Sequence, residues 1–109
     1  MEKTDGIRQF VFMFVIDLHY IVPLETLDAH MAEHVKFLRK YYSQNVFVAS
    51  GRKVPRTGGI ILALADSREV LDKILTEDPF FAHGLAEFRI TEFQTSQYHP
   101  ELKKLLKAR

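Results

Sequence analysis

The order of apolar and polar positions along the chain predicts four strands. An unbroken apolar run from Phe10 to Ile16 predicts a strand at about 9–18 that is buried on both faces. Two shorter apolar runs and one stretch that alternates between apolar and polar residues predict three more strands, at 46–51, 60–65 and 85–93. The alternating strand has one wet face, which is typical of a sheet edge, and its alternation breaks at Glu92 and Phe93, which suggests a bulge.

Apolar residues at helical spacing predict two helices between these strands. The first begins after Pro23, extends to about residue 43 and has an apolar stripe of Leu24, Leu27, Met31, Val35, Leu38 and Tyr42. The second is capped by Ser67 and has a buried side of Val70, Leu71, Ile74 and Leu75. A last amphipathic segment, from Pro100 to Arg109, predicts a short helix that needs a surface to dock on, in its own subunit or in a partner.

A single helical turn is predicted at 78–84. Asp78 suits the N-cap, Pro79 suits the first helical position, and Gly84 suits the residue just past the end. Asn45 is predicted to leave the long helix in the left-handed conformation, which asparagine tolerates.

The resulting order, βαββαβ, is typical of a ferredoxin-like α+β sandwich with the first and third strands at the centre of the sheet. We expect one domain over 1–109, with a core at about 9–96 and an amphipathic tail at 98–109. Both helices lie on one face of such a sheet. Since the central strands are apolar on both sides, we expect a second copy to cover the open face and form a homodimer.

The composition narrows the classes of partner. The chain has 15 Lys and Arg against 14 Asp and Glu, so its formal net charge of +1 creates no general attraction for nucleic acid or an anionic membrane. The apolar run that ends before Asp17 is too short to span a bilayer, and we expect no membrane association. The absence of cysteine excludes disulfides, thiol nucleophiles and thiolate metal sites. The cytoplasm is the expected location.

Two histidines one helical turn apart form a string found in some zinc peptidases, His30-Met31-Ala32-Glu33-His34. Such a site also needs a carboxylate ligand on a second helix and a substrate cleft, for which a small sandwich has little room. We therefore expect no bound metal, and His30 to be a solvated helix residue.

His34 and Asp78 each allow two interpretations. His34 falls roughly 60° from the centre of its apolar stripe, at the border between core and solvent. There an imidazole is either a partly buried side chain bonded to the backbone or a group that meets a ligand. Asp78 is either an N-cap or a carboxylate that also orients a histidine. The residue types alone leave both pairs of alternatives open.

The sequence resembles the YciI-like (YCII) family from about Phe12 to Phe93. The resemblance rests on His34-x-x-x-Leu38, Ser50-Gly51, Gly58-Gly59-Ile60, Ser67 and, most specifically, Asp78-Pro79-Phe80 followed by Gly84. It implies a ferredoxin-like fold, a dimeric α/β-barrel-type assembly through the open sheet face, and an active site built on a His and Asp pair. By position these residues are His34 and Asp78, and His30 does not match.

The resemblance also guides the expected chemistry. One branch of the family is similar to cofactor-free lyases that act on chlorinated hydroxylated aromatics, so we expect no cofactor and a small anionic or hydroxylated aromatic ligand. Many relatives have Gly-Pro at the end of the second strand, where this chain has Gly51-Arg52. Arg52 therefore places a cation there, and we expect it to bind substrate, with Lys53 and Arg56 in the same cationic loop. Solvated loop charges are the alternative.

Three further polar residues are candidates to line the same pocket, and for each the alternative is a role in packing or exposure to solvent: Tyr20, Ser50 and His83. The leading hypothesis is a cofactor-free enzyme in which Asp78 fixes the tautomer of His34 and the imidazole moves a proton in an elimination or isomerisation. The alternative is a non-catalytic dimeric module that binds a metabolite or a partner.

Overall fold

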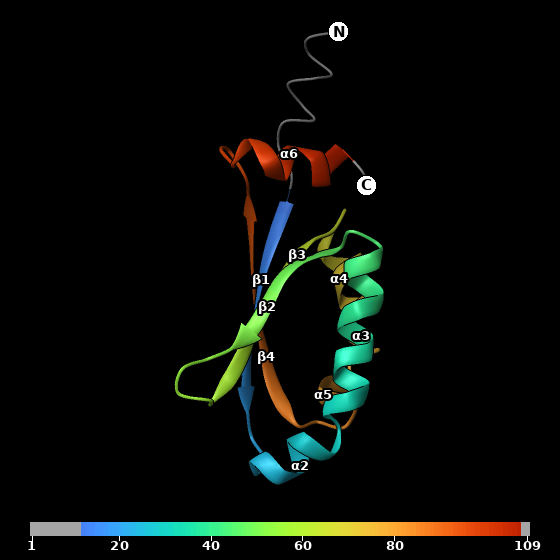
Figure 1. The fold of residues 1–109 in the computed structure, drawn as a ribbon, viewed down its shortest axis with the longest axis vertical. Coiled ribbons are helices and arrows are strands. Elements are labelled where there is room, and N and C mark those ends of the chain that lie inside the picture. Colours follow the sequence, from blue (N-terminus) through green and yellow to red (C-terminus); the bar gives the residue numbers. More distant parts are fainter. Residues whose placement is uncertain (1–11, 108–109) are drawn as a thin grey trace, which may run out of the picture.

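The computed structural model describes residues 12–107 as a four-stranded antiparallel sheet with three helices against one face (Figure 1). In chain order the elements are β1 (Phe12–Tyr20), α2 (Leu24–Ala29), α3 (Met31–Ser43), β2 (Phe47–Arg52), β3 (Gly58–Leu64), α4 (Arg68–Leu75), α5 (Pro79–Ala82), β4 (Ala86–Gln94) and α6 (Pro100–Lys107). The predicted strand residues 9–11 and tail residues 108–109 lie outside the described part of the chain.

The sheet has the order β2-β3-β1-β4, which confirms that the first and third strands are central and that the last strand is at an edge. The predicted bulge in β4 is wrong, because its pairing with β1 is continuous from Gln94 to Ala86. Phe93 is opposite Met13 and lies on the same face of the sheet as Arg89 and Thr91, so an apolar residue follows polar ones on that face without a change in the strand pairing. The sheet irregularity lies instead in β2, between Phe47 and Ala49.

The predicted single helix over 24–43 is wrong, because α2 and α3 meet at His30 and differ in direction (Figure 1). In a continuous helix the backbone N–H of His30 would bond to the carbonyl oxygen of Thr26. That oxygen instead lies 3.1 Å from His30 Nδ1, and the His30 backbone N–H donates to Leu27 at 2.9 Å. The side chain thus takes the place of the backbone in the hydrogen-bond ladder, and the helix ends.

This break changes which face of α3 is buried. The buried residues of α3 are His34, Phe37 and Tyr41. Most members of the predicted stripe are only partly buried, and Leu24 is 41% exposed. His34 is therefore a buried residue, at 9% exposure, and its predicted place at the solvent border was wrong. The predicted stripe assumed one continuous helix from Leu24, so its helical spacing no longer applies after the break at His30.

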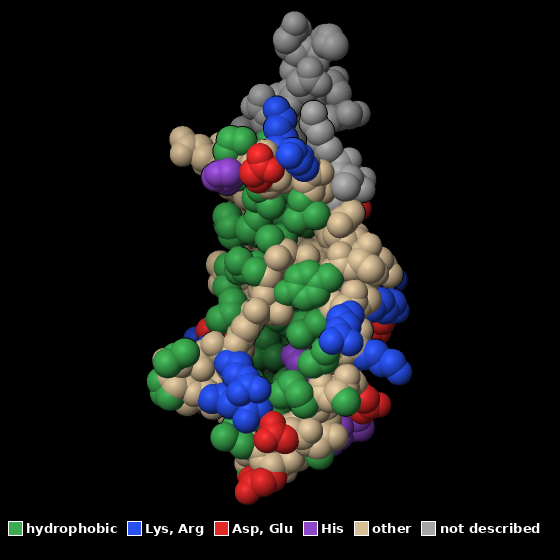
Figure 2. All heavy atoms as spheres, in the orientation of Figure 1, with side chains coloured by type: hydrophobic (Ala, Val, Ile, Leu, Met, Phe, Trp, Pro, Cys, Tyr) green, Lys and Arg blue, Asp and Glu red, His purple; other side chains and the backbone are tan. Residues whose placement is uncertain are grey.

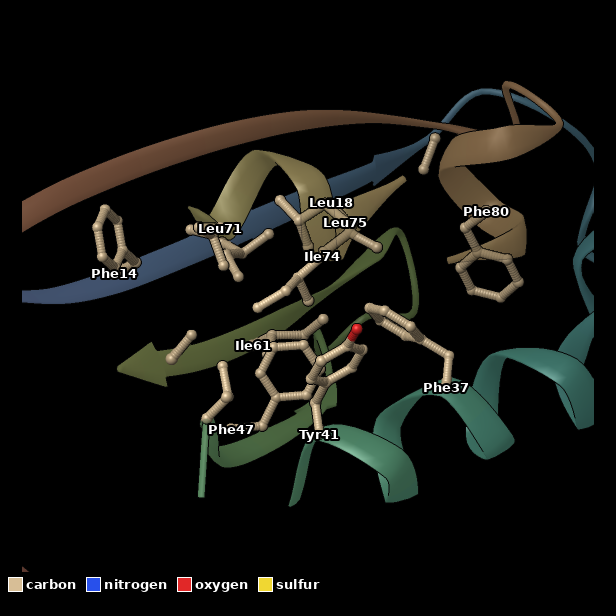
Figure 3. Close-up of a cluster of buried hydrophobic side chains, with 14 of the residues drawn as sticks. Phe14, Leu18, Phe37, Tyr41, Phe47, Ile61, Leu71, Ile74, Leu75 and Phe80 are labelled. Carbon is tan, nitrogen blue, oxygen red and sulfur yellow. The ribbon is translucent and has the colours of Figure 1, made fainter. Parts of the chain in front are cut away.

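The core fills the space between the sheet and the helices α3, α4 and α5 (Figure 3). Ala63 in β3 is fully buried and lies opposite Phe14 on one side and Phe47 on the other, so its small side chain leaves room for two aromatic rings. Most of the predicted buried side of α4 is confirmed, but Val70 is 43% exposed, so its assignment to that side was wrong.

Local signals at the ends of helices are confirmed. The Ser67 hydroxyl caps α4 and accepts a hydrogen bond from the backbone N–H of Val70 at 3.1 Å. Asp78 caps α5 with Pro79 at its start, and Gly84 and Asn45 have the left-handed φ values of 64° and 61°. None of the helices within residues 12–107 is long and apolar enough to cross a membrane.

The other face of the sheet is divided into an apolar end and a charged end. Strand pairing places five apolar residues on this face toward the start of β1: Met13, Val15, Leu62, Leu64 and Phe93. It places four polar residues toward the end of β1: Asp17, His19, Glu87 and Arg89. The helices α3, α4 and α5 cover the opposite face, and α6 lies across the end of the sheet (Figure 1).

Candidate functional site

The structure brings His34 and Asp78 into direct contact across 44 positions of sequence. Asp78 begins α5, His34 lies in α3, and His34 Nδ1 is 2.8 Å from Asp78 Oδ1. A carboxylate accepts hydrogen bonds, so the imidazole Nδ1–H donates to Asp78. This bond assigns the tautomer of a neutral His34 and leaves Nε2 as the ring nitrogen available to a ligand.

The same short turn also holds the imidazole ring by stacking. The ring of Phe80 lies parallel to that of His34, with centroids 4.0 Å apart and planes 5° apart. The rings of Phe80 and Tyr20 are nearly perpendicular, with centroids 6.1 Å apart. A hydrogen bond to Nδ1 and a stacked aromatic face together restrict both the position and the rotation of His34, so the ring is preorganised before any ligand arrives.

Asp78 is placed in an unusual environment for an N-cap. Its side chain is fully buried, and Oδ1 accepts both the bond from His34 and a bond from the Phe80 backbone N–H at 2.9 Å. Oδ2 is buried as well, without a hydrogen-bond partner among the described residues. An unpaired buried acceptor costs about 1–3 kcal/mol, whereas a solvent-exposed aspartate would cap the turn without this cost.

A second set of contacts ties α3 to the residue before Asp78. Lys40 Nζ and the Tyr41 hydroxyl donate to the two carboxylate oxygens of Glu77, at 2.7 Å and 2.5 Å. Hydrogen bonds from Lys40 and then Tyr41 lower the pKa of Glu77, while burial and then Glu77 raise the pKa of Tyr41. Sequence analysis missed this contact, although Tyr41 lies two helical turns beyond His34 on the same face.

His34 lines a pocket of about 250 Å³ between α3 and the sheet. Its polar lining residues are Tyr20, His34, Ser50 and Arg52. Its apolar walls include Met31, Val35 and Leu38, which sequence analysis had assigned to the stripe of the helix that faces the core. Figure 2 shows the hollow, with a histidine inside it and Lys or Arg side chains at its margin. The volume is below the range of about 300–1,000 Å³ that drug-sized ligands occupy, so the pocket suits a small molecule.

The residues that sequence analysis suggested for this site divide into two groups. Tyr20, Ser50 and Arg52 line the pocket with His34, and the Ser50 hydroxyl is 2.7 Å from that of Tyr42. The other three candidates do not line it: His83, Lys53 and Arg56. The cationic loop is therefore split, since only Arg52 of its three cations reaches the pocket.

Each of the three other residues has a different neighbour. The His83 ring lies 4.7 Å from that of His30, Lys53 pairs with Asp17 on the opposite face of the sheet, and Arg56 pairs with Asp28. The contacts of Lys53 and Arg56 depend on strands and helices that are distant in the chain. Their positions could not be predicted from loop composition.

The two histidines of the peptidase-like string do not converge on one point. His34 contacts Asp78 and Phe80, while His30 bonds to the Thr26 carbonyl and lies against His83. Within residues 12–107, no group of three or more His, Cys, Asp or Glu is arranged to hold a metal ion.

The fold is similar to those of solved structures. One similar solved structure is 5-chloro-2-hydroxyhydroquinone dehydrochlorinase from Burkholderia phenoliruptrix AC1100, in complex with 2,5-dihydroxybenzoquinone. It has a TM-score of 0.61 at 17% identity, over 83% of this chain and 97% of that chain. Another is a point mutant of SnoaB, a cofactor-independent oxygenase from Streptomyces nogalater, with a TM-score of 0.47 at 15% identity, over 82% and 96% of the two chains.

The likeness to the dehydrochlorinase concerns the fold. A search by sequence among curated proteins found no match. The profile of the YCII-related domain, however, matches residues 13–94, which is most of the chain. The chain therefore belongs to the family of YCII-related domains.

Proposed function

We propose that this protein is a cofactor-free enzyme that uses His34 and Asp78 to transfer a proton on a small anionic or hydroxylated aromatic substrate. The observation that carries the proposal is the 2.8 Å contact between a buried carboxylate and a histidine that lines a pocket. A fully buried Asp78 with an unpaired oxygen is a costly way to cap one turn, and orienting a base gives that cost a function.

In this mechanism Asp78 holds the Nδ1–H of His34, and Nε2 accepts a proton from the substrate. In an elimination, the electron pair of the broken C–H bond forms a double bond and the leaving group departs with its electrons. In an isomerisation, His34 returns the proton to a different atom. Arg52 at the pocket wall stabilises the negative charge of the substrate, and the apolar walls hold its ring.

A hydroxylated aromatic ring is the first substrate class to test. The dehydrochlorinase with a similar fold was solved in complex with 2,5-dihydroxybenzoquinone, although at 17% identity the likeness supports only the choice of compounds. The pocket volume of about 250 Å³ favours a single ring over a fused ring system.

The test is a screen of chlorinated and unchlorinated hydroquinones, catechols and small enolisable acids for turnover. His34→Ala should abolish turnover, while the control His99→Ala, an exposed histidine near α6, should keep it. Turnover that survives unchanged in His34→Ala would refute the role of this histidine. If the protein binds a compound saturably but turns over none of those tested, the non-catalytic binding module is favoured instead.

We also propose that the protein works as a homodimer through the open sheet face. At the apolar end of this face Met13 and Leu64 are already buried within one chain, but Val15 and Leu62 are only half-buried and Phe93 is 42% exposed, so a second copy would cover apolar side chains there. Leu62→Arg should convert a dimer into a monomer in light scattering, whereas Val70→Arg, on the exposed side of α4, should not. A wild-type protein that is monomeric at all working concentrations would contradict the proposal.

A further inference from the structure

The pocket contains a second aromatic polar group besides His34, which is Tyr20 at the end of β1. Its ring forms a T-shaped pair with Phe80, the same ring on which His34 stacks. One buried side chain therefore contacts both the imidazole and the phenol, and both line the same pocket. The pocket therefore offers a ligand both a proton acceptor and a hydroxyl donor.

The phenol of Tyr20 has a cation beside it that does not itself line the pocket. Arg56 donates from Nη2 to Asp28 Oδ1 at 2.6 Å. The pKa of Arg56 is raised, first by this hydrogen bond to Asp28 and to a smaller extent by the adjacent Tyr20 side chain. Asp28 in α2 thus holds the guanidinium next to the tyrosine.

The surroundings of Arg56 differ from those of a solvated loop charge. Its side chain is 22% exposed, against 57% for Asp28. Its Nε is buried without a hydrogen-bond partner among the described residues, which is unfavourable for a donor. A surface ion pair would not require such burial, so the position of this guanidinium calls for another explanation.

Backbone contacts fix the loop that carries Arg56 against the end of β1. The backbone N–H of Tyr20 donates to the Thr57 carbonyl at 3.0 Å, and that of Lys53 donates to the Gly58 carbonyl at 2.9 Å. The residue next to Arg56 is therefore bonded directly to Tyr20. This backbone bond brings Arg56 near Tyr20, and the ion pair with Asp28 restrains its guanidinium.

We propose that Tyr20 donates a hydrogen bond to the anionic oxygen of a phenolic or enolic ligand, and that Arg56 is a positioning residue that stabilises this contact through Tyr20. The inference rests on the proposed function and adds a second polar contact to it. As His34 removes a proton, negative charge spreads onto the ligand oxygen. The Tyr20 hydroxyl donates a hydrogen bond to that oxygen and stabilises its negative charge. The nearby guanidinium makes the hydroxyl a stronger donor without occupying the pocket.

The probe for this inference is 4-nitrocatechol, whose visible absorption differs between the phenol and phenolate forms. Tyr20→Phe keeps the ring that contacts Phe80 and removes only the hydroxyl. It should weaken binding about 5- to 10-fold, the equivalent of one hydrogen bond, and should lower the phenolate fraction of bound probe at constant pH. Arg56→Gln should change both readouts in the same direction, and Arg68→Gln, in the exposed pair with Asp72 on α4, should change neither.

The double variant separates a positioning role from an independent one. If Arg56 acts through Tyr20, Arg56→Gln should have no further effect on binding or absorption in the Tyr20→Phe protein. An equal effect of Arg56→Gln with and without the tyrosine hydroxyl would overturn the inference. So would a Tyr20→Phe protein that binds the probe and shifts its absorption as the wild type does.

Failure of this inference can be distinguished from failure of the proposed function. A wild-type protein that does not bind 4-nitrocatechol would overturn the ligand class on which both depend. Normal probe binding in Tyr20→Phe, together with turnover that still requires His34, would overturn this inference alone. Thermal unfolding of each variant shows whether it is folded, and Asp28→Asn provides a second way to release Arg56 if Arg56→Gln is unstable.

Discussion

The contact between Asp78 and His34 makes a quantitative prediction about stability. Asp78→Ala removes a cap, which costs about 0.5–2 kcal/mol, and leaves the buried Nδ1–H of His34 without an acceptor, which costs about 1–3 kcal/mol more. The variant also removes the unpaired Oδ2, which costs the wild type about 1–3 kcal/mol, so the net loss should not exceed about 4 kcal/mol. In a His34→Ala protein the penalty for an unpaired Nδ1–H is absent, so Asp78→Ala should cost about 1–3 kcal/mol less there. The expected coupling energy between the two residues is about 1–3 kcal/mol.

The assay is urea unfolding of the wild type, both single variants and the double variant. The chain has no tryptophan, so far-UV circular dichroism is the appropriate signal. Protein concentration must be equal in all four samples, because dimerisation would make stability depend on it. A coupling energy below about 0.5 kcal/mol would show that the two side chains do not stabilise one another, and the paired site would lose its physical basis.

Asp78→Asn separates the cap from the charge. Since Oδ1 makes both hydrogen bonds, an asparagine oxygen can replace it in both. The amide nitrogen then occupies the buried position of Oδ2, where it has no acceptor among the described residues. Because Oδ2 is unpaired there in the wild type too, the two penalties of about 1–3 kcal/mol largely cancel, and stability should change little. Turnover should fall because the carboxylate charge is lost. Full turnover in Asp78→Asn would show that Asp78 acts on His34 through geometry alone.

Three other predictions concern different parts of the molecule. The hydrogen bond from Lys40 is the main cause of the lowered pKa of Glu77. The stabilisation from ionised Glu77 is therefore fully present above its ordinary pKa and is lost as the pH falls through the lowered pKa. Glu77→Gln should flatten the acid side of the curve of stability against pH, and an unchanged curve would contradict this. Gly58→Ala should destabilise the protein by more than about 3 kcal/mol in urea unfolding, because a Cβ there would lie 1.8 Å from the Leu18 carbonyl oxygen. A loss of less than about 1 kcal/mol would argue against this strand pairing. Elemental analysis of untagged protein should find no stoichiometric zinc, and one zinc per chain that disappears in His30→Ala would contradict the absence of a metal site.

Many features of the fold could be predicted from the sequence because they depend on neighbouring residues. Pro79 and Gly84 bound a single helical turn, and Ser67 caps a helix, since each of these preferences acts over only a few positions. Continuous apolar runs identified the two central strands, because only a strand covered on both faces buries every side chain. The pairing of His34 with Asp78 was suggested by family resemblance, and spacing along the chain offered no evidence for it.

The orientation of α3 could not be predicted from periodicity. The break at His30 arises because a side chain competes for the Thr26 carbonyl, and periodicity does not detect that competition. The break determines which side of α3 faces the core. As a result His34 is buried, and Met31 lies with it at the pocket wall.

The two polar contacts that surround the candidate site were also decided by tertiary structure. Glu77 meets Tyr41 only because α5 packs near α3, and Arg56 lies near Tyr20 only because Thr57, in the loop after β2, is bonded to the end of β1. The sequence determines which residues can cap, bury or carry charge, since those properties belong to each side chain and its close neighbours. Which charges meet which rings is determined by the docking of helices on the sheet, because hydrogen bonds and stacking act over a few ångströms in space, whatever the separation along the chain.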